Sequence, residues 1–219
     1  MPSASPSAGK LTALQRRVLE EFFARESRFI LTGGAALGGF HLGHRPTKDL
    51  DLFSTSAPVE EADRVLREVA TAMQGEIVEL TTAPDFRRRL VRTASGAVMV
   101  DLVRDRAVHG DTPPVKFGTI LVDAPEEILA NKLCTLLSRS ERRDLVDVLA
   151  LERAGYRVED AMPLAERKDG GMTPGQFGWV LSTIEIGEDA ILPEGFTPAD
   201  LRSLLAELRL RMGRLASPG

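Results

Sequence analysis

The sequence predicts an α+β fold in two parts, because the pattern of hydrophobic residues changes near residue 123. Before Asp123-Ala124-Pro125, strand-like and helix-like segments alternate, whereas after it the spacing is helical throughout. With 219 residues, of which 43% are hydrophobic, the chain can bury one sizeable core or two small ones. We therefore expect a disordered Ser/Pro-rich tail at residues 1–9, an α/β domain at residues 10–122 and a helical domain at residues 123–219.

The first part contains amphipathic helices and short strand-like runs. Hydrophobic residues recur on one side of residues 11–23 and 58–73, and a proline stands at the start of the second segment. Short apolar or alternating runs are typical of strands, and they occur at residues 29–31, 49–53, 76–80, 86–93 and 97–103. Residues 94–96 favour a tight turn, which would join the last two runs as a hairpin.

The second part carries only helical spacing. It predicts helices at residues 125–137, 145–151, 158–167, 173–179 and from residue 197 onward. Thr197 and Pro198, with an acid in the first turn, are a good start signal for the last helix. Pro163 limits the third helix.

Composition excludes several classes of protein. The chain has no apolar run long enough to span a bilayer and no signal-peptide pattern. Cys134 is the only cysteine, so no intrachain disulfide can form, and we expect a cytoplasmic protein. The net charge of −4 argues against a purely electrostatic nucleic-acid binder.

The most informative segment is the acidic strand Asp49-Leu50-Asp51-Leu52-Phe53. Residues two apart in a strand point to the same face, so Asp49 and Asp51 project together while the leucines face the core. Two neighbouring carboxylates repel each other unless a cation offsets their charge, and Mg²⁺ or Mn²⁺ suits such oxygen ligands. The alternative is a pair of solvent-facing aspartates on an edge strand.

A glycine turn precedes this acidic strand. The apolar run at residues 29–31 leads into Thr32-Gly33-Gly34, and residues 35–42 predict a short helix. Adjacent glycines let backbone N–H groups approach a ligand closely, and a helix N-terminus favours anions. A phosphate-binding turn followed by a metal-binding strand is the layout of a site for a metal-bound nucleoside triphosphate.

These residues carry a family resemblance, over Gly33-Gly34-x-Ala36-Leu37 and His41-Leu42-Gly43-His44-Arg45-x-Thr47-x-Asp49-Leu50-Asp51-Leu52-Phe53. The pattern resembles the opening motif of AbiEii/AbiGii-type nucleotidyltransferase toxins, in the DNA polymerase β-like nucleotidyltransferase superfamily. Lys132 and Arg142-Arg143-Asp144-Leu145-x-Asp147 resemble the later Lys and R-D-x-x-D elements of that family. The chain departs from the family at Gly34 and Ala35, where relatives carry a Ser or Thr hydroxyl, so Thr32 would have to supply that contact.

The resemblance implies a mixed β-sheet flanked by helices and an enzyme that moves a nucleoside monophosphate from an NTP to an acceptor hydroxyl. It implies a tRNA 3′ end as that acceptor, Mg²⁺ or Mn²⁺ as cofactor, and a toxin paired with a separately encoded antitoxin. The implied catalytic residues are Asp49, Asp51, Asp101, Lys132 and Asp144, of which the first three bind metal. The implied substrate-binding residues are Thr32, Gly33, Gly34, Arg45 and Lys48.

Asp101 is the predicted third carboxylate because it is the single acid in the middle of a strand-like run. A buried carboxylate needs a partner, and a hairpin would bring Asp101 beside the acidic strand. The alternative is an acid paired with Arg104 or Arg92, and Asp105 and Asp123 are weaker candidates for the same role.

Lys132 and Asp144 each have a structural alternative. Lys132 lies among leucine and isoleucine residues, where it either reaches triphosphate oxygens or rests at the rim of the core. In both cases we expect Lys132→Met to leave stability nearly unchanged. Asp144, with Asp147 as a weaker candidate, either orients the lysine, acts on the acceptor hydroxyl, or simply favours a helix dipole.

Three basic clusters and two other functions stay open. Arg87-Arg88-Arg89 with Arg92, the cluster around Arg142, and the arginines of the last helix either follow a polynucleotide backbone or are balanced by neighbouring acids. The acceptor could also be a protein or a small molecule such as an antibiotic. A non-catalytic module that binds a nucleotide or an antitoxin is the remaining alternative.

Overall fold

The computed structural model describes residues 9–217. The chain forms two compact units, one built from the residues up to Arg106 together with Asp111–Ala124, the other from Ala107–Gly110 together with the residues from Pro125 onward. The expected disordered tail lies, apart from Gly9, outside the described residues. The division into independent domains at residues 10–122 and 123–219 stays a prediction.

The first unit contains a mixed sheet, as the family resemblance implies. Its strands are β1 (Ile30–Thr32), β2 (Asp49–Ser54), β3 (Glu76–Ala83), β4 (Phe86–Thr93), β5 (Gly96–Arg104), β6 (Val115–Phe117) and β7 (Ile120–Val122). Within the described residues the strand order is β3-β4-β5-β2-β1-β7-β6. The pairs β2–β5 and β1–β7 are parallel, and the other neighbours are antiparallel. The α+β fold class is therefore confirmed.

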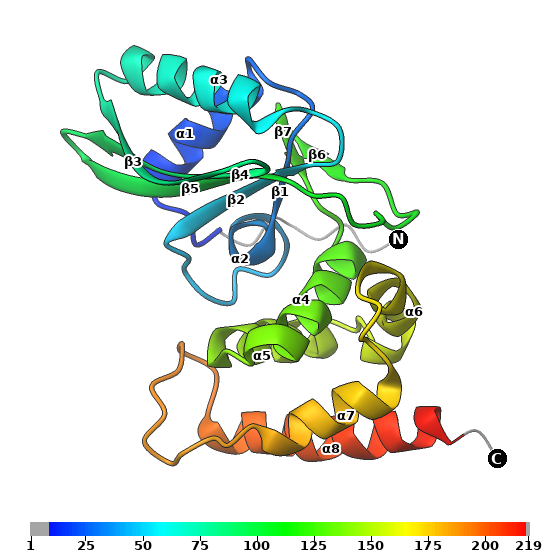
Figure 1. The fold of residues 1–219 in the computed structure, drawn as a ribbon. Helices are drawn as coiled ribbons and strands as arrows, with labels where there is room; N and C mark the ends of the chain where they lie inside the picture. The colour runs from blue at the N-terminus through cyan, green and yellow to red at the C-terminus, as the bar shows by residue number, and fades with distance from the viewer. Residues whose placement is uncertain (1–8, 218–219) are drawn as a thin grey trace. The chain divides into compact units, whose positions relative to one another are not determined.

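The helices of this unit lie on both faces of the sheet (Figure 1). Helices α1 (Ala13–Phe23) and α3 (Val59–Ala72) pack against each other on one face, and α2 (Gly33–Ala36) lies on the other. A capping box between Thr12 and Gln15 starts α1. Burial alternates along β2, with Leu50 and Leu52 fully buried. The core thus lies on the α1/α3 side, which leaves the opposite face of β2 to Asp49 and Asp51.

The second unit is helical. It contains α4 (Pro125–Arg139), α5 (Arg142–Arg153), α6 (Val158–Lys168), α7 (Pro174–Thr183) and α8 (Pro198–Ala216). Arg211 of α8 pairs with Glu152 of α5 and Glu159 of α6, which ties three helices together. Residues 107–110 join this unit because the Gly110 N–H donates to the buried Glu127 carboxylate at 2.7 Å.

Several elements differ from the sequence expectation. The helix expected at residues 35–42 begins at Gly33, so both glycines lie in its first turn, and it continues as a π-helix, η1 (Leu37–His41). The strands β6 and β7 are not predicted from the sequence, because three residues are too few to show an alternating pattern. Among the described helices, none has both the length and the apolar character needed to cross a membrane.

Candidate active site

The register of the sheet brings the three predicted metal ligands together in the first unit. Asp51 of β2 lies opposite Asp101 of the parallel strand β5 on one side and opposite Thr32 of β1 on the other. Asp49 shares the face of Asp51 because the two are separated by one residue of the same strand. Asp49 and Asp51 are half-buried, and Asp101 is 5% exposed.

The backbone at Gly33 fits closely against this acidic face. Gly33 has a φ of +66°, a conformation that residues with a side chain rarely adopt. A Cβ atom at Gly33 would lie 2.5 Å from Oδ2 of Asp51, which is shorter than any normal contact. Any side chain at this position would therefore force the Asp51 carboxylate to move. Of the two glycines that the sequence singles out, Gly33 is thus favoured here by space as well as by conformation.

Two further predicted residues border the same turn. The Thr32 side chain is buried, and its Oγ1 has no hydrogen-bond partner within the described part of the chain. The Arg45 guanidinium lies against Gly34, where a Cβ atom would be 2.8 Å from Arg45 Nη2. A hydroxyl, a cation and backbone N–H groups thus surround the start of α2. This combination suits phosphate oxygens.

A fourth charged residue, Arg88, completes the acidic face. Its Nε donates to Asp101 Oδ1 at 2.8 Å and its Nη2 donates to Asp101 Oδ2 at 2.6 Å. These hydrogen bonds raise the pKa of Arg88 above its ordinary value and outweigh the opposing effect of burial, and the charges of Asp49 and Asp51 raise it further. The alternative expected from the sequence is an ion pair of Asp101 with Arg104 or Arg92. The structure shows Arg88 as the partner instead.

In the sequence Arg88 stands out only as part of a basic cluster, but the predicted hairpin also indicates its partner. With a two-residue turn, Thr93 faces Gly96, and counting back along both strands sets Arg88 opposite Asp101. The same alternation splits the triplet: Arg87 and Arg89 point the other way and pair with Glu60 and Asp63 of α3. The triplet is therefore not one basic surface.

Lys132 and Asp144 lie in the second unit, where they form a buried cluster with Asp147. Lys132 Nζ is 2.7 Å from both Asp144 Oδ1 and Asp147 Oδ2. Both aspartates are fully buried, and Arg139 Nε lies 3.4 Å from Asp144 Oδ2, without hydrogen-bond geometry. The lysine is thus held between two acids rather than resting at the rim of the core.

The pKa of Lys132 shows which effect dominates in this cluster. Burial alone lowers it, but the charges of Asp147 and Asp144 and the hydrogen bonds to them raise the pKa above the ordinary lysine value of 10.5. Lys132 is therefore charged at neutral pH. Its ion pairs stabilise the folded state below that value and are lost only as the pH rises through the raised pKa.

The remaining predicted residues are less closely tied to the site. Lys48 is exposed in the segment before β2. Asp105 follows β5, and its N–H donates to the Ser54 carbonyl. Asp123 is buried after β7, where its carbonyl oxygen is 2.8 Å from His41 Nε2. Both contacts involve backbone atoms of Asp105 and Asp123, so neither supports a role for these acids in place of Asp101.

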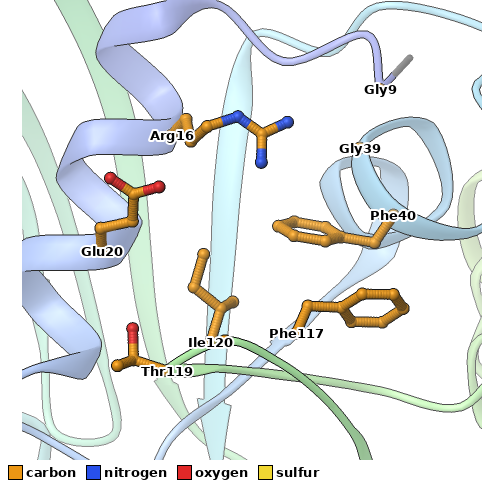
Figure 2. Close-up of a pocket in the computed structure, with 9 residues that line it drawn as sticks. Gly9, Arg16, Glu20, Gly39, Phe40, Phe117, Thr119 and Ile120 are labelled. Carbon is orange, nitrogen blue, oxygen red and sulfur yellow. The ribbon is translucent and has the colours of Figure 1, made fainter. Parts of the chain in front are cut away.

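A separate cavity of about 470 Å³ lies elsewhere in the first unit. Figure 2 shows the rings of Phe40 and Phe117 side by side with Arg16 facing them, and the ring centroids are 5.2 Å apart. The Arg16 guanidinium is 5.8 Å from the centre of the Phe40 ring. The lining contains none of the predicted catalytic or substrate-binding residues.

The acidic face is chemically suited to a divalent cation. Its donors are carboxylate oxygens from two adjacent strands, and beside them lies the Thr32 hydroxyl, which has no hydrogen-bond partner among residues 9–217. Hard oxygen donors of this kind favour Mg²⁺ and Mn²⁺ over softer metals. The residues present therefore fit the metal that the family resemblance implies.

Comparison with known proteins assigns the family. The model of the family described as nucleotidyl transferase AbiEii toxin, type IV TA system, matches residues 17–216. This chain belongs to that family. The AbiEii assignment confirms the predicted resemblance, and it makes the protein a nucleotidyltransferase.

Solved structures agree with the fold of this AbiEii family member. JHP933 from Helicobacter pylori is 20% identical with a TM-score of 0.58, and the match covers 93% of this chain and 92% of that one. A second H. pylori protein, described as a candidate nucleotidyltransferase, is 19% identical with a TM-score of 0.59, covering 92% and 94%. No curated protein matches the sequence significantly. At this identity the two structures support the fold alone.

Proposed function

We propose that this AbiEii family nucleotidyltransferase depends on Mg²⁺ or Mn²⁺ and adds a nucleotide to RNA, with the tRNA 3′ end as acceptor. The observation that carries the proposal is the alignment of Asp49, Asp51 and Asp101 on one face of the sheet, next to the turn at Gly33. Clustered carboxylates repel one another unless positive charge offsets them, and their position beside the glycine turn supports catalysis with a bound divalent cation.

In this reaction the acceptor oxygen forms a bond to the α-phosphorus, and the bond to the departing pyrophosphate breaks. The divalent cation, when bound, neutralises phosphate charge and favours ionisation of the attacking hydroxyl. The chain itself positions the triphosphate through the Thr32 hydroxyl and the backbone of Gly33 and Gly34. Arg45 beside Gly34 offsets negative charge on the phosphates, and Lys48 is a second candidate for that role.

Lys132 and Asp144 enter the proposal as a linked pair. The Lys132–Asp144 contact of 2.7 Å supports a role in which the acid fixes the orientation of the ammonium group. In that role Lys132 offsets charge that develops on the triphosphate, and Asp144 acts through the lysine. Asp147 holds the lysine from its other side.

The family description supports a function as the toxin of a bacterial toxin–antitoxin pair. The proposed setting is the cytoplasm, where NTPs and tRNA are present, and the proposed partner is a separately encoded antitoxin. Expression in a bacterial host should then arrest growth, while the Asp51→Asn variant should be tolerated. Arrest by both proteins would point instead to a binding effect or to misfolding.

The direct test is transfer of label from NTPs. The pure protein is incubated with Mg²⁺, each α-labelled NTP in turn and total bacterial RNA, with Asp51→Asn as the matched inactive control. Label in the tRNA fraction that requires Asp51 supports the proposal. Label in protein or in an added aminoglycoside assigns a different acceptor. An absence of transfer to all three would favour the non-catalytic binding module.

A further inference from the structure

The acidic face carries a cation of its own. Arg88 forms two parallel hydrogen bonds with Asp101, which occupy both oxygens of the third carboxylate. Asp101 is 5% exposed and lies within a six-residue register with β2, directly opposite Asp51. An ion that binds Asp101 must therefore meet the guanidinium of Arg88.

Arg88 differs from its two neighbours in the same strand. The Arg87 and Arg89 side chains are 10% and 2% exposed and pair with acids of α3 on the core side. The Arg88 side chain is 43% exposed, and its guanidinium lies 5.8 Å from the centre of the Phe86 ring. A long side chain that is nearly half in solvent can leave its partner and remain hydrated, whereas Arg89 cannot.

The charges around the Arg88–Asp101 ion pair explain why a divalent cation would displace Arg88. The hydrogen bonds to Asp101 have the largest influence on Arg88, and the charges of Asp49 and Asp51 act on it as well, so the guanidinium offsets part of the negative charge of the acidic face. A divalent cation on the same oxygens supplies more positive charge at a shorter distance. Two cations that share one carboxylate repel each other, and the one that can reach water is the one that moves.

We propose that Arg88 is the internal counter-ion of the metal site: it holds Asp101 while no metal is bound, and the divalent cation displaces it. The proposal rests on the proposed metal dependence of this enzyme. It makes Arg88 a positioning residue that acts through Asp101. Removal of the Arg88 guanidinium should therefore increase the affinity for the metal and lower the thermal stability of the metal-free protein.

The test compares Mn²⁺ binding and thermal unfolding in wild type and Arg88→Gln. Gln keeps a polar side chain but removes the charge and the paired donors. We expect Arg88→Gln to bind Mn²⁺ on the order of tenfold more tightly, as measured from the free Mn²⁺ signal in electron paramagnetic resonance. Without metal its Tm should fall by several degrees, because Asp101 loses its partner. Saturating Mn²⁺ should remove that difference.

Controls separate this proposal from the metal site itself. Arg92→Gln, in the same strand but paired with Glu76 away from the carboxylates, should bind Mn²⁺ like wild type. Arg88→Lys keeps the charge without the paired hydrogen bonds and should fall between wild type and Arg88→Gln. Equal or weaker Mn²⁺ binding by Arg88→Gln, with Asp101→Asn still impaired, would overturn the counter-ion and leave the metal site standing. Binding that is equally absent in wild type, Arg88→Gln and Asp101→Asn would overturn the metal site itself.

Discussion

The two acidic clusters of this chain balance their charge in opposite ways. On β2 and β5, three carboxylates face one side of the sheet, two of them half-buried, and an arginine that is 43% exposed pairs with the third. Between α4 and α5, two fully buried aspartates enclose Lys132 at 2.7 Å. In the first cluster the arginine that pairs with Asp101 reaches solvent, whereas in the second cluster the lysine is enclosed by its two acids.

Because of this difference, the acidic face of β2 and β5 is suited to bind an added cation. The cluster around Lys132 is not, because its lysine is enclosed. When a charged side chain that can reach water loses its partner, the folded state is destabilised only slightly. A buried charge that loses its partner destabilises the folded state by several kcal/mol. Substitutions in the sheet should therefore change chemistry more than stability. Substitutions around Lys132 should change stability first.

The largest expected effect is that of Lys132→Met on folding. The substitution leaves two buried carboxylates without their cation, so the free energy of unfolding should fall by about 3–5 kcal/mol. Urea denaturation measures it, with Lys116→Met on the exposed strand β6 as a control that should change by less than about 0.5 kcal/mol. The triple variant with Asp144→Asn and Asp147→Asn should recover most of the loss. If Lys132→Met were as stable as wild type, the Lys132 cluster would not differ from the acidic face in its importance for stability.

Asp51→Asn should have the opposite profile. It removes a carboxylate from the proposed metal site, so transfer should fall by at least ~10²-fold, the scale of one preorganised electrostatic element. The free energy of unfolding should stay constant or rise slightly, because like-charge repulsion with Asp49 and Asp101 is relieved. Single-turnover transfer and urea denaturation of the same preparation give both values. A variant that keeps full activity would remove Asp51 from the mechanism.

Gly33→Ala should affect both properties. The added Cβ would lie 2.5 Å from Asp51 Oδ2, and a φ of +66° is unfavourable for alanine. We expect a loss of about 1–3 kcal/mol in stability, typical of a strained backbone position, together with weaker Mn²⁺ binding. Gly118→Ala, at a φ of +63° with open space around it, is the matched control for the conformational part alone. Normal Mn²⁺ binding by Gly33→Ala would argue against close contact between the turn and the site.

Thr32→Val tests the hydroxyl next to the site. Its Oγ1 has no partner among the described residues, so an apolar replacement of the same shape should leave stability within about 0.5 kcal/mol of wild type. If the hydroxyl contacts phosphate, the KM for the NTP should rise by roughly tenfold, equivalent to one hydrogen bond of about 1.4 kcal/mol. An unchanged KM would mean that Thr32 does not replace the Ser or Thr hydroxyl that relatives carry at the positions of Gly34 and Ala35.

The smallest effect concerns pH. Because the pKa of Lys132 is raised above 10.5, its ion pairs stay intact across the neutral range. The stability difference between wild type and Lys132→Met should therefore be constant between about pH 7 and pH 9, and should shrink only above pH 10.5. Urea denaturation of both proteins at these pH values tests whether the pKa of Lys132 is raised or lowered. A difference that shrinks already near pH 8 would mean that burial lowers this pKa.

Much of the acidic face follows from local patterns in the sequence. The alternation in β2 places Asp49 and Asp51 on one face, and the hairpin at residues 86–104 places Asp101 in the middle of its second strand. These predictions need only the two-residue period of a strand and one tight turn. The register between β2 and β5 is known only from the structure, because nothing local in the sequence pairs strands that lie so far apart.

Other features depend on packing that the sequence does not display. The spacing of Lys132 is the same for a lysine at the rim of the core and for one enclosed by two acids. Only the approach of α5 to α4 decides between them, and it reverses the expectation that Lys132→Met leaves stability nearly unchanged. Similarly, Arg87, Arg88 and Arg89 look like one basic cluster until the strand separates them by face.

The parallel pairing of β2 and β5 also affects when the acidic face can form during synthesis. The chain leaves β2, passes through α3 and the strands β3 and β4, and only then returns to place β5 beside it. Contacts between distant segments form late, because the loop between them must first be closed. A nascent chain that ends before residue 96 contains the glycine turn and both acids of β2 but lacks the third carboxylate. Assembly of the charged face is thus tied to emergence of nearly the whole first unit from the ribosome.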